Sequence, residues 1–216
     1  IRPKRVAKAG ERPALALKKY GVEYLEVRLF DLNPFVDIGI VPAQSTFADI
    51  LLLMCLFHQS PPISAREQGE NDENQTRIVN QGRQPDLTLL VYNREQAFRP
   101  IAHALFDDMQ PFAQMLDVAY GGDNYSRTLA SLRTRIDHPE TTPSAQVLLA
   151  AREHKGYFKF AMQQSQQHHE SLLAQALDAA TLAKFDDSVQ ASLVEQQRLE
   201  SLPQGRFEDY VASYYA

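Results

Sequence analysis

The most regular alternation of apolar and polar positions lies near the start of the chain, over residues 22–30. A period of two is typical of a β-strand, and it places Tyr24, Glu26 and Arg28 on one face. The opposite face is mostly apolar. This segment is therefore predicted to be a strand that presents a carboxylate and a guanidinium two residues apart.

The residues before this strand predict a second strand and a short helix. Residues 1–6 form an extended run, and residues 11–20 contain good helix formers closed by Gly21. The opening is therefore predicted to be β-α-β-like, followed by an irregular connection over residues 31–42.

Apolar residues then recur at helical spacing. Thr46 followed by Asp49 is a capping signature, and it predicts a helix that starts there and stops at the Ser-Pro-Pro turn of residues 60–62. The polar stretch 64–83 predicts another helix. Cys55 lies in the apolar part of the first of these helices, so it is predicted to be a core residue rather than a nucleophile.

A possible hairpin covers residues 87–101, with its turn at 93–96. It precedes a long amphipathic helix over residues 101–116. Gly121 and Gly122 are predicted to form the junction to the next helix.

The remainder of the chain reads as helix after helix. Asp123 is the predicted N-cap of the helix that reaches residue 136, and Thr142 that of a helix with proline at its first position. From there the tail is predicted to be helical, with breaks at Gly156, Pro203 and Gly205. Its apolar stripe is predicted to comprise Leu172, Leu173, Ala176, Leu177 and Ala180.

These elements predict an α+β fold with a small sheet in the first ~40 residues, a possible hairpin near 87–101 and a mostly helical remainder. Hydrophobic residues make up 44% of the 216 residues and charged residues 23%, as in ordinary globular proteins. We expect one structural portion over 1–216, with strands over 1–42 and mainly helices over 43–216.

The formal net charge of −5 argues against a protein that binds nucleic acid through many phosphate contacts. The first 19 residues are nevertheless basic, so contact with a phosphate or carboxylate stays open beside the commoner explanation, a solvated surface. The longest apolar run, residues 50–57, is too short to span a bilayer, so no membrane partner is expected. The single cysteine suggests a reduced, cytoplasmic setting.

Glu26 and Arg28 are the leading candidates for chemistry. A carboxylate can ligate a divalent ion through oxygen, and a guanidinium can contact a phosphoryl group by two hydrogen bonds. The alternative is a surface ion pair of little energetic value. The six histidines form no recognisable metal motif, and the His-His-Glu run at 168–170 is interpreted as a solvated helix face.

Three segments resemble the proteobacterial type of the glutamate-cysteine ligase family: residues 1–5 (IRPKR), 21–28 (GVEYLEVR) and 31–35 (DLNPF). The similarity continues through residues 76–89 and on to the end of the chain. It implies part of a glutamine-synthetase-like antiparallel sheet with helices packed outside, within a larger catalytic domain. By this resemblance Glu26 corresponds to a magnesium ligand, and Arg28 to the catalytic arginine that contacts the transferred phosphoryl group of ATP.

The resemblance implies an ATP-dependent ligase that joins the side-chain carboxylate of L-glutamate to L-cysteine, giving γ-glutamylcysteine, the first step of glutathione biosynthesis. The implied cofactors are ATP and Mg²⁺. The family's other metal ligands lie in a long N-terminal region, so we expect a further segment of the same enzyme to precede Ile1. This chain would then supply only part of the active site and be inactive alone. The alternative is a non-catalytic helical interaction module derived from the ligase.

Overall fold

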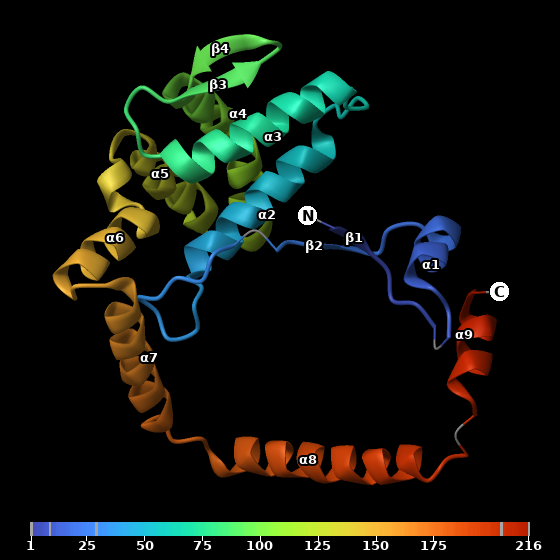
Figure 1. The fold of residues 1–216 in the computed structure, drawn as a ribbon. Helices are drawn as coiled ribbons and strands as arrows, with labels where there is room; N and C mark the ends of the chain where they lie inside the picture. Colours follow the sequence, from blue (N-terminus) through green and yellow to red (C-terminus); the bar gives the residue numbers. More distant parts are fainter. Residues whose placement is uncertain (1, 9, 29, 204, 216) are drawn as a thin grey trace. The chain divides into compact units, whose positions relative to one another are not determined.

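The computed structural model describes residues 2–8, 10–28, 30–203 and 205–215, and it divides into two compact units. One unit comprises residues 1–32 together with 172–216, and the other residues 33–171. The mostly helical chain with a small antiparallel sheet near its start confirms the predicted fold class (Figure 1). The assignment of 1–216 to one portion of a larger catalytic domain stays a prediction.

The first unit begins with the predicted β-α-β order: β1 (Arg2–Lys4), α1 (Pro13–Tyr20) and β2 (Tyr24–Glu26). The two strands are antiparallel, with Arg2 opposite Glu26 and Lys4 opposite Tyr24. The strand predicted over 22–30 is shorter than expected, because among the described residues β1 is its one ladder partner and pairs with three of its positions. Leu29 lies outside the described residues.

The second unit is helical apart from one hairpin. Its elements are α2 (Pro42–Phe57), α3 (Ala65–Gln81), β3 (Thr88–Val91), β4 (Arg94–Ala97), α4 (Phe98–Tyr120), α5 (Asn124–Asp137), the 3-10 turn η1 (Pro139–Thr141), α6 (Pro143–Glu153) and most of α7 (Tyr157–Leu173).

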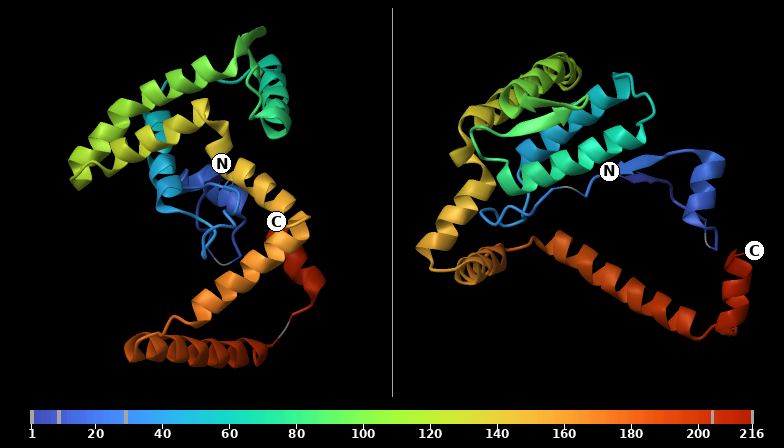
Figure 2. Two further views of the ribbon diagram at one scale, coloured as in Figure 1. Left: turned by 90° about the vertical axis from the view of Figure 1, so that its left-hand side faces the viewer. Right: turned by 45° about the horizontal axis from the view of Figure 1, so that its top comes forward.

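The core of this unit lies where α2, α4 and α5 pack together (Figure 2). Its buried side chains are Ile50, Met54, Met109, Ala113 and Leu129. On α2 the buried positions are four residues apart, which is one face of a helix. Cys55 lies next to that row and is exposed, so its prediction as a core residue is wrong.

Helix α2 has its N-cap at Val41, five residues before the Thr46 that the capping signature predicted. Pro42 occupies its first position, where the missing N–H costs nothing. The backbone N–H of Val41 donates to Gln44 Oε1 at 3.0 Å, so this N–H at the start of the helix has a hydrogen-bond partner. Thr46 is instead buried within the helix.

The hairpin between β3 and β4 is real, but its turn is Tyr92-Asn93 rather than residues 93–96. Both residues have positive φ, 50° and 60°, as in the two-residue type I′ turn whose twist matches that of paired strands. Residues 94–97 therefore belong to the second strand, and α4 begins directly after them.

Helix α3 binds the outer edge of the hairpin through side chains. Asn74 accepts from the Leu90 N–H at 2.7 Å and donates to the Leu90 carbonyl at 2.8 Å. Arg77 Nη1 donates to the Thr88 carbonyl at 3.3 Å and pairs with Glu95 at 2.8 Å. The second strand pairs with β3 on its other side, so both edges of β3 have partners.

The junction between α4 and α5 is made by Gly121 and Gly122, as predicted, with φ of 81° and 89°. Asp123 is the N-cap residue of α5, as predicted, but its side chain makes no capping hydrogen bond. The buried Asp117 accepts from the Tyr125 N–H at 2.8 Å and the Ser126 N–H at 3.0 Å. A carboxylate on one helix thus satisfies the first turn of the next.

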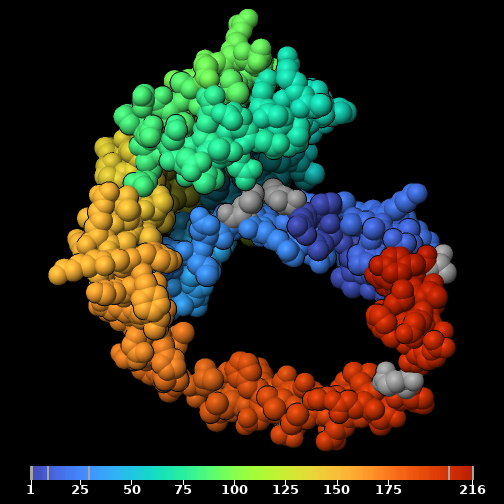
Figure 3. All heavy atoms as spheres, in the orientation of Figure 1, coloured from blue at the N-terminus to red at the C-terminus, as the bar shows by residue number. Residues whose placement is uncertain are grey.

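The tail holds α8 (Ala179–Glu200) and α9 (Phe207–Tyr215). The predicted stripe from Leu172 to Ala180 is wrong, because α7 ends at Leu173 and Asp178 caps a new helix through the Thr181 N–H. Apart from Thr181, α8 is exposed along its length (Figure 3). Across the described ranges, no helix combines the length and apolar character needed to span a bilayer.

Candidate functional site

The structure brings the two predicted site residues, Glu26 and Arg28, into contact. Arg28 Nε donates to Glu26 Oε1 at 2.7 Å. The Lys4 ammonium lies 3.2 Å from the other oxygen, Oε2, at ion-pair distance but without hydrogen-bond geometry. The Glu26 side chain is 29% exposed and the Arg28 side chain 57%. The site is therefore a half-buried carboxylate between two cations, one of which extends into solvent.

These cations keep Glu26 ionised. The hydrogen bond from Arg28, followed by the contact with Lys4, holds the pKa of the Glu26 carboxyl below its ordinary value, against an opposing effect of desolvation. The carboxylate is thus available as an oxygen ligand at neutral pH.

Lys4 is the member of this cluster that sequence reasoning did not single out. It stands opposite Tyr24 in the ladder, and Glu26 is its diagonal neighbour, a distance that a long side chain can cover. The sequence did contain a signal for Lys4. Two alternating strands that are joined by a short helix can pair with each other, and residues on the same face then come into contact.

A second ion pair fastens the same hairpin. Arg5 Nη1 lies 3.7 Å from Glu23 Oε2, and Arg5 Nε donates to the Gly21 carbonyl at 2.7 Å. Glu23 also accepts from the Val6 N–H at 3.2 Å. These contacts lock the two strand ends together, a structural role distinct from that of Glu26 and Arg28.

Glu26 does not belong to a complete metal site among the described residues. No group of three or more histidine, cysteine or acidic side chains suited to a metal ion occurs within the described ranges. A Mg²⁺ ion prefers six oxygen ligands. Glu26 fits as one ligand of such an ion, and the rest of the coordination would come from substrate, water or other protein segments.

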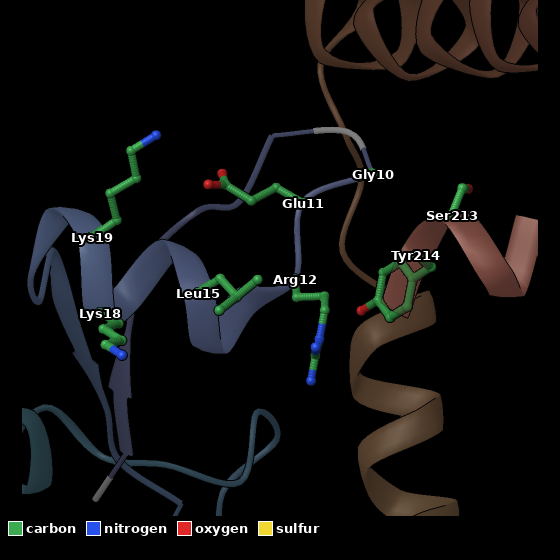
Figure 4. Close-up of a pocket in the computed structure, with 8 residues that line it drawn as sticks. All are labelled: Gly10, Glu11, Arg12, Leu15, Lys18, Lys19, Ser213 and Tyr214. Atoms are coloured by element: carbon green, nitrogen blue, oxygen red, sulfur yellow. The ribbon is translucent and has the colours of Figure 1, made fainter. Parts of the chain in front are cut away.

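Basic residues from the start of the chain also line an open pocket of ≈ 580 Å³ within the first unit (Figure 4). Its lining comprises Gly10, Glu11, Arg12, Leu15, Lys18, Lys19, Ser213 and Tyr214. Lys19 lies over the Tyr20 ring at 4.9 Å, and Arg12 over the Tyr215 ring at 5.1 Å. Part of the predicted basic run is thus engaged with aromatic rings rather than simply solvated.

Two histidines have partners that are distant in the sequence. His103 Nε2 lies 3.2 Å from Asp137 Oδ1, and Arg133 Nε donates to its Nδ1 at 3.2 Å. His168 contacts Asp37 and Pro34, so the interpretation of residues 168–170 as a solvated face is wrong for His168. Sequence spacing alone cannot distinguish a helix face exposed to solvent from one that packs against a loop distant in the sequence.

The candidate site residues Glu26 and Arg28 lie in a segment that matches a known protein family. Residues 1–78 match the family model described as glutamate-cysteine ligase. The whole chain is 40% identical to a glutamate–cysteine ligase of Azotobacter vinelandii and 38% identical to one of Alcanivorax borkumensis. It covers 41% of the length of each of these relatives.

A solved structure is also similar to this chain. A crystal structure of glutamate–cysteine ligase from Francisella tularensis in complex with AMP superposes with a TM-score of 0.89 and 30% sequence identity. The match covers 99% of this chain and 42% of the other. The similarity thus runs along essentially all of this chain and less than half of each relative.

Proposed function

We propose that this chain, a member of the glutamate-cysteine ligase family, supplies one part of the site at which ATP drives the joining of L-glutamate to L-cysteine. The observation that carries the proposal is the Glu26–Arg28 contact, which lies inside the region matched by the family model. Because the chain covers 41% of its relatives, the complete activity is proposed for the whole enzyme rather than for these residues alone.

The proposed reaction has two steps. The γ-phosphoryl group of ATP passes to the side-chain carboxylate of glutamate, which gives an acyl phosphate and ADP. The amine of cysteine then attacks the acyl carbon, forming the amide bond and releasing phosphate with loss of the amine proton. Most of the catalysis in phosphoryl transfer comes from positioning and from stabilising the negative charge on the transferred group.

Arg28 is proposed to neutralise the transferred phosphoryl group. Glu26 holds its Nε, and this fixes the plane of the guanidinium while its terminal nitrogens extend toward solvent. Within the described part of the chain, Glu26 is the one ion-pair partner of Arg28. An arginine oriented in this way can form two parallel hydrogen bonds with phosphate oxygens.

Glu26 is proposed as a ligand of Mg²⁺. The Oε2 atom is shielded from water and lacks a hydrogen bond among the described residues, so it can accept a cation if Lys4 moves aside. A magnesium ion held there would supply positive charge that offsets the negative charge of the phosphate groups. Nucleotide binding is supported by the AMP that the Francisella tularensis ligase holds in its crystal structure.

The remaining metal ligands and the glutamate and cysteine sites are proposed to come from an N-terminal segment of the same enzyme. A single carboxylate cannot complete a magnesium site, and a sheet of two three-residue strands is too small to be stable by itself. The alternative, a non-catalytic helical module, has less support, because the relatives that match the entire chain are named as ligases.

The test measures ADP release from ATP, magnesium, glutamate and cysteine by the full-length protein and by residues 1–216 alone. We expect activity in the full-length protein alone, lost on Glu26→Ala and strongly reduced on Arg28→Ala. Glu23→Gln is the matched control, because it changes a neighbouring carboxylate that pairs with Arg5 and keeps an acceptor for the Val6 N–H.

Magnesium dependence separates the two roles. At saturating magnesium, Arg28→Ala should weaken the dependence of the rate on ATP concentration. Glu26→Asp should instead raise the magnesium concentration needed for half-maximal rate. Wild-type rates in both alanine variants would refute the site assignment. Full activity of the isolated chain would refute its incompleteness.

A further inference from the structure

The loop that joins β2 to α2 contains hydrogen bonds between its own residues. Asn33 N–H donates to the Gly39 carbonyl at 2.7 Å, and the Gly39 N–H donates to the Val36 carbonyl at 3.1 Å. The Asn33 side chain accepts from the Phe35 N–H at 3.0 Å. Residues 33–39 therefore form a small internally bonded loop within the second unit.

Helix α7 holds this loop by two kinds of contact, although about 130 residues separate them along the chain. The rings of Phe35 and the buried Phe160 lie 5.6 Å apart. Near the other end of α7, Ser171 Oγ donates to Asp37 Oδ2 at 2.8 Å. The two phenyl rings carry no charge, whereas the polar end of the contact contains a histidine.

His168 meets an acceptor at each ring nitrogen. Its Nδ1 lies 3.1 Å from Asp37 Oδ1, and its Nε2 lies 2.7 Å from the Pro34 carbonyl oxygen. A carbonyl and an ionised carboxylate can only accept hydrogen bonds, and a neutral imidazole has one N–H. Both contacts can be hydrogen bonds at once only when the ring carries two protons.

His103, which also has a partner at each ring nitrogen, has a different arrangement. Arg133 donates to Nδ1 of His103, so that nitrogen must accept, while Nε2 faces Asp137. The neutral ring with its proton on Nε2 satisfies both contacts of His103. The demand for a charged ring is therefore specific to the geometry at His168.

We propose that His168 is a protonation-dependent clasp that holds the 33–39 loop against α7. With both nitrogens protonated, the ring bridges the Pro34 carbonyl and the Asp37 carboxylate, while Ser171 supports the second oxygen of Asp37. Loss of one proton leaves one of the two ring contacts without a hydrogen bond, so the polar end of the contact loosens while Phe35 stays packed.

The charge environment agrees with this assignment. In the part of the chain that the structure describes, Asp37 is the charged group within ion-pair distance of His168, and it comes from the loop. On the helix itself, Glu170 accepts a hydrogen bond from Gln166, and His169 is exposed. The clasp is therefore complete when the ring carries both protons, and it loosens when one is lost.

The test is amide hydrogen exchange of the full-length protein at about pH 5.5 and about pH 8, corrected for the intrinsic effect of pH. Peptides over residues 33–41 should lose about fivefold in protection at the higher pH, the equivalent of one partly exposed hydrogen bond. His168→Gln should remove this dependence. The control His169→Gln changes the exposed neighbour and should keep it.

Nitrogen NMR of the histidine rings provides a second measurement that needs no variant to be stable. The His168 ring should show two protonated nitrogens at the acidic pH, coupled to Asp37 and Pro34, and should lose one as the loop loosens. Equal protection of the loop at both pH values would overturn the proposal. An unchanged pH dependence in His168→Gln would overturn it as well. Neither measurement depends on enzymatic activity, so the clasp and the proposed function can fail separately.

Discussion

Replacement of Leu129 by alanine tests the account of the helical core. Leu129 is 1% exposed and packs among Ile50, Met54, Met109 and Ala113, which come from α2 and α4. The change removes three carbon groups, and at about 0.8 kcal/mol for each buried group the lost transfer free energy is about 2.4 kcal/mol. The cavity left between three helices raises the expected loss of unfolding free energy to about 3–5 kcal/mol.

The assay is urea unfolding of the full-length protein followed by far-UV circular dichroism, together with hydrogen exchange of peptides from α2, α4 and α5. All three helices should lose protection together, because they share one core. Leu149→Ala on α6 is the matched control: the same atoms are removed from a side chain that is 58% exposed, and the expected change is within about 0.5 kcal/mol. A loss below about 1 kcal/mol for Leu129→Ala would contradict the assignment of Leu129 to this core.

Two further substitutions test the junctions of the second unit. Burial raises the pKa of Asp117, but hydrogen bonds from Ser126 and Tyr125 outweigh it and lower the pKa overall. Its stabilising effect is therefore present above the ordinary carboxyl range and is lost as the pH falls through the lowered pKa. Asp117→Asn should reduce stability at neutral pH and flatten the acid limb of the stability curve in acid titrations followed by circular dichroism, and an unchanged acid limb would argue against the cap. Asn93→Val should destabilise the hairpin by about 1–2 kcal/mol because φ is positive there, whereas Asn93→Gly should not. Hydrogen-exchange rates of peptides over 88–97 measure the difference. Equal exchange rates in the two variants would contradict the turn assignment.

Much of the helical architecture could be predicted from local patterns. Helix α3 lies within the stretch predicted to be helical, residues 64–83, and Thr142 caps α6 as predicted, through the Ala145 N–H. These signals are local, because the groups that end a helix lie within four residues of its terminus. The alternation over residues 22–30 likewise placed Glu26 beside Arg28.

The errors arose where a partner distant in sequence determines the structure. Asp123 is the N-cap residue of α5 as predicted, but the carboxylate that accepts hydrogen bonds from the first turn is Asp117 on the preceding helix. Lys4 completes the candidate site only through strand pairing, and His168 is covered by a loop about 130 residues away. Neither periodicity nor capping rules contain such contacts, because those rules describe neighbours within one element.

The way α3 binds the hairpin also bears on how the protein avoids aggregation. An unpaired strand edge presents N–H and C=O groups that can recruit a strand from another molecule. On β3 these groups at Leu90 are already bonded to the Asn74 amide, and the Thr88 carbonyl is bonded to Arg77. Helix α3 therefore acts as a side-chain substitute for a third strand, and this edge offers a neighbouring molecule no free pair of backbone groups at Leu90.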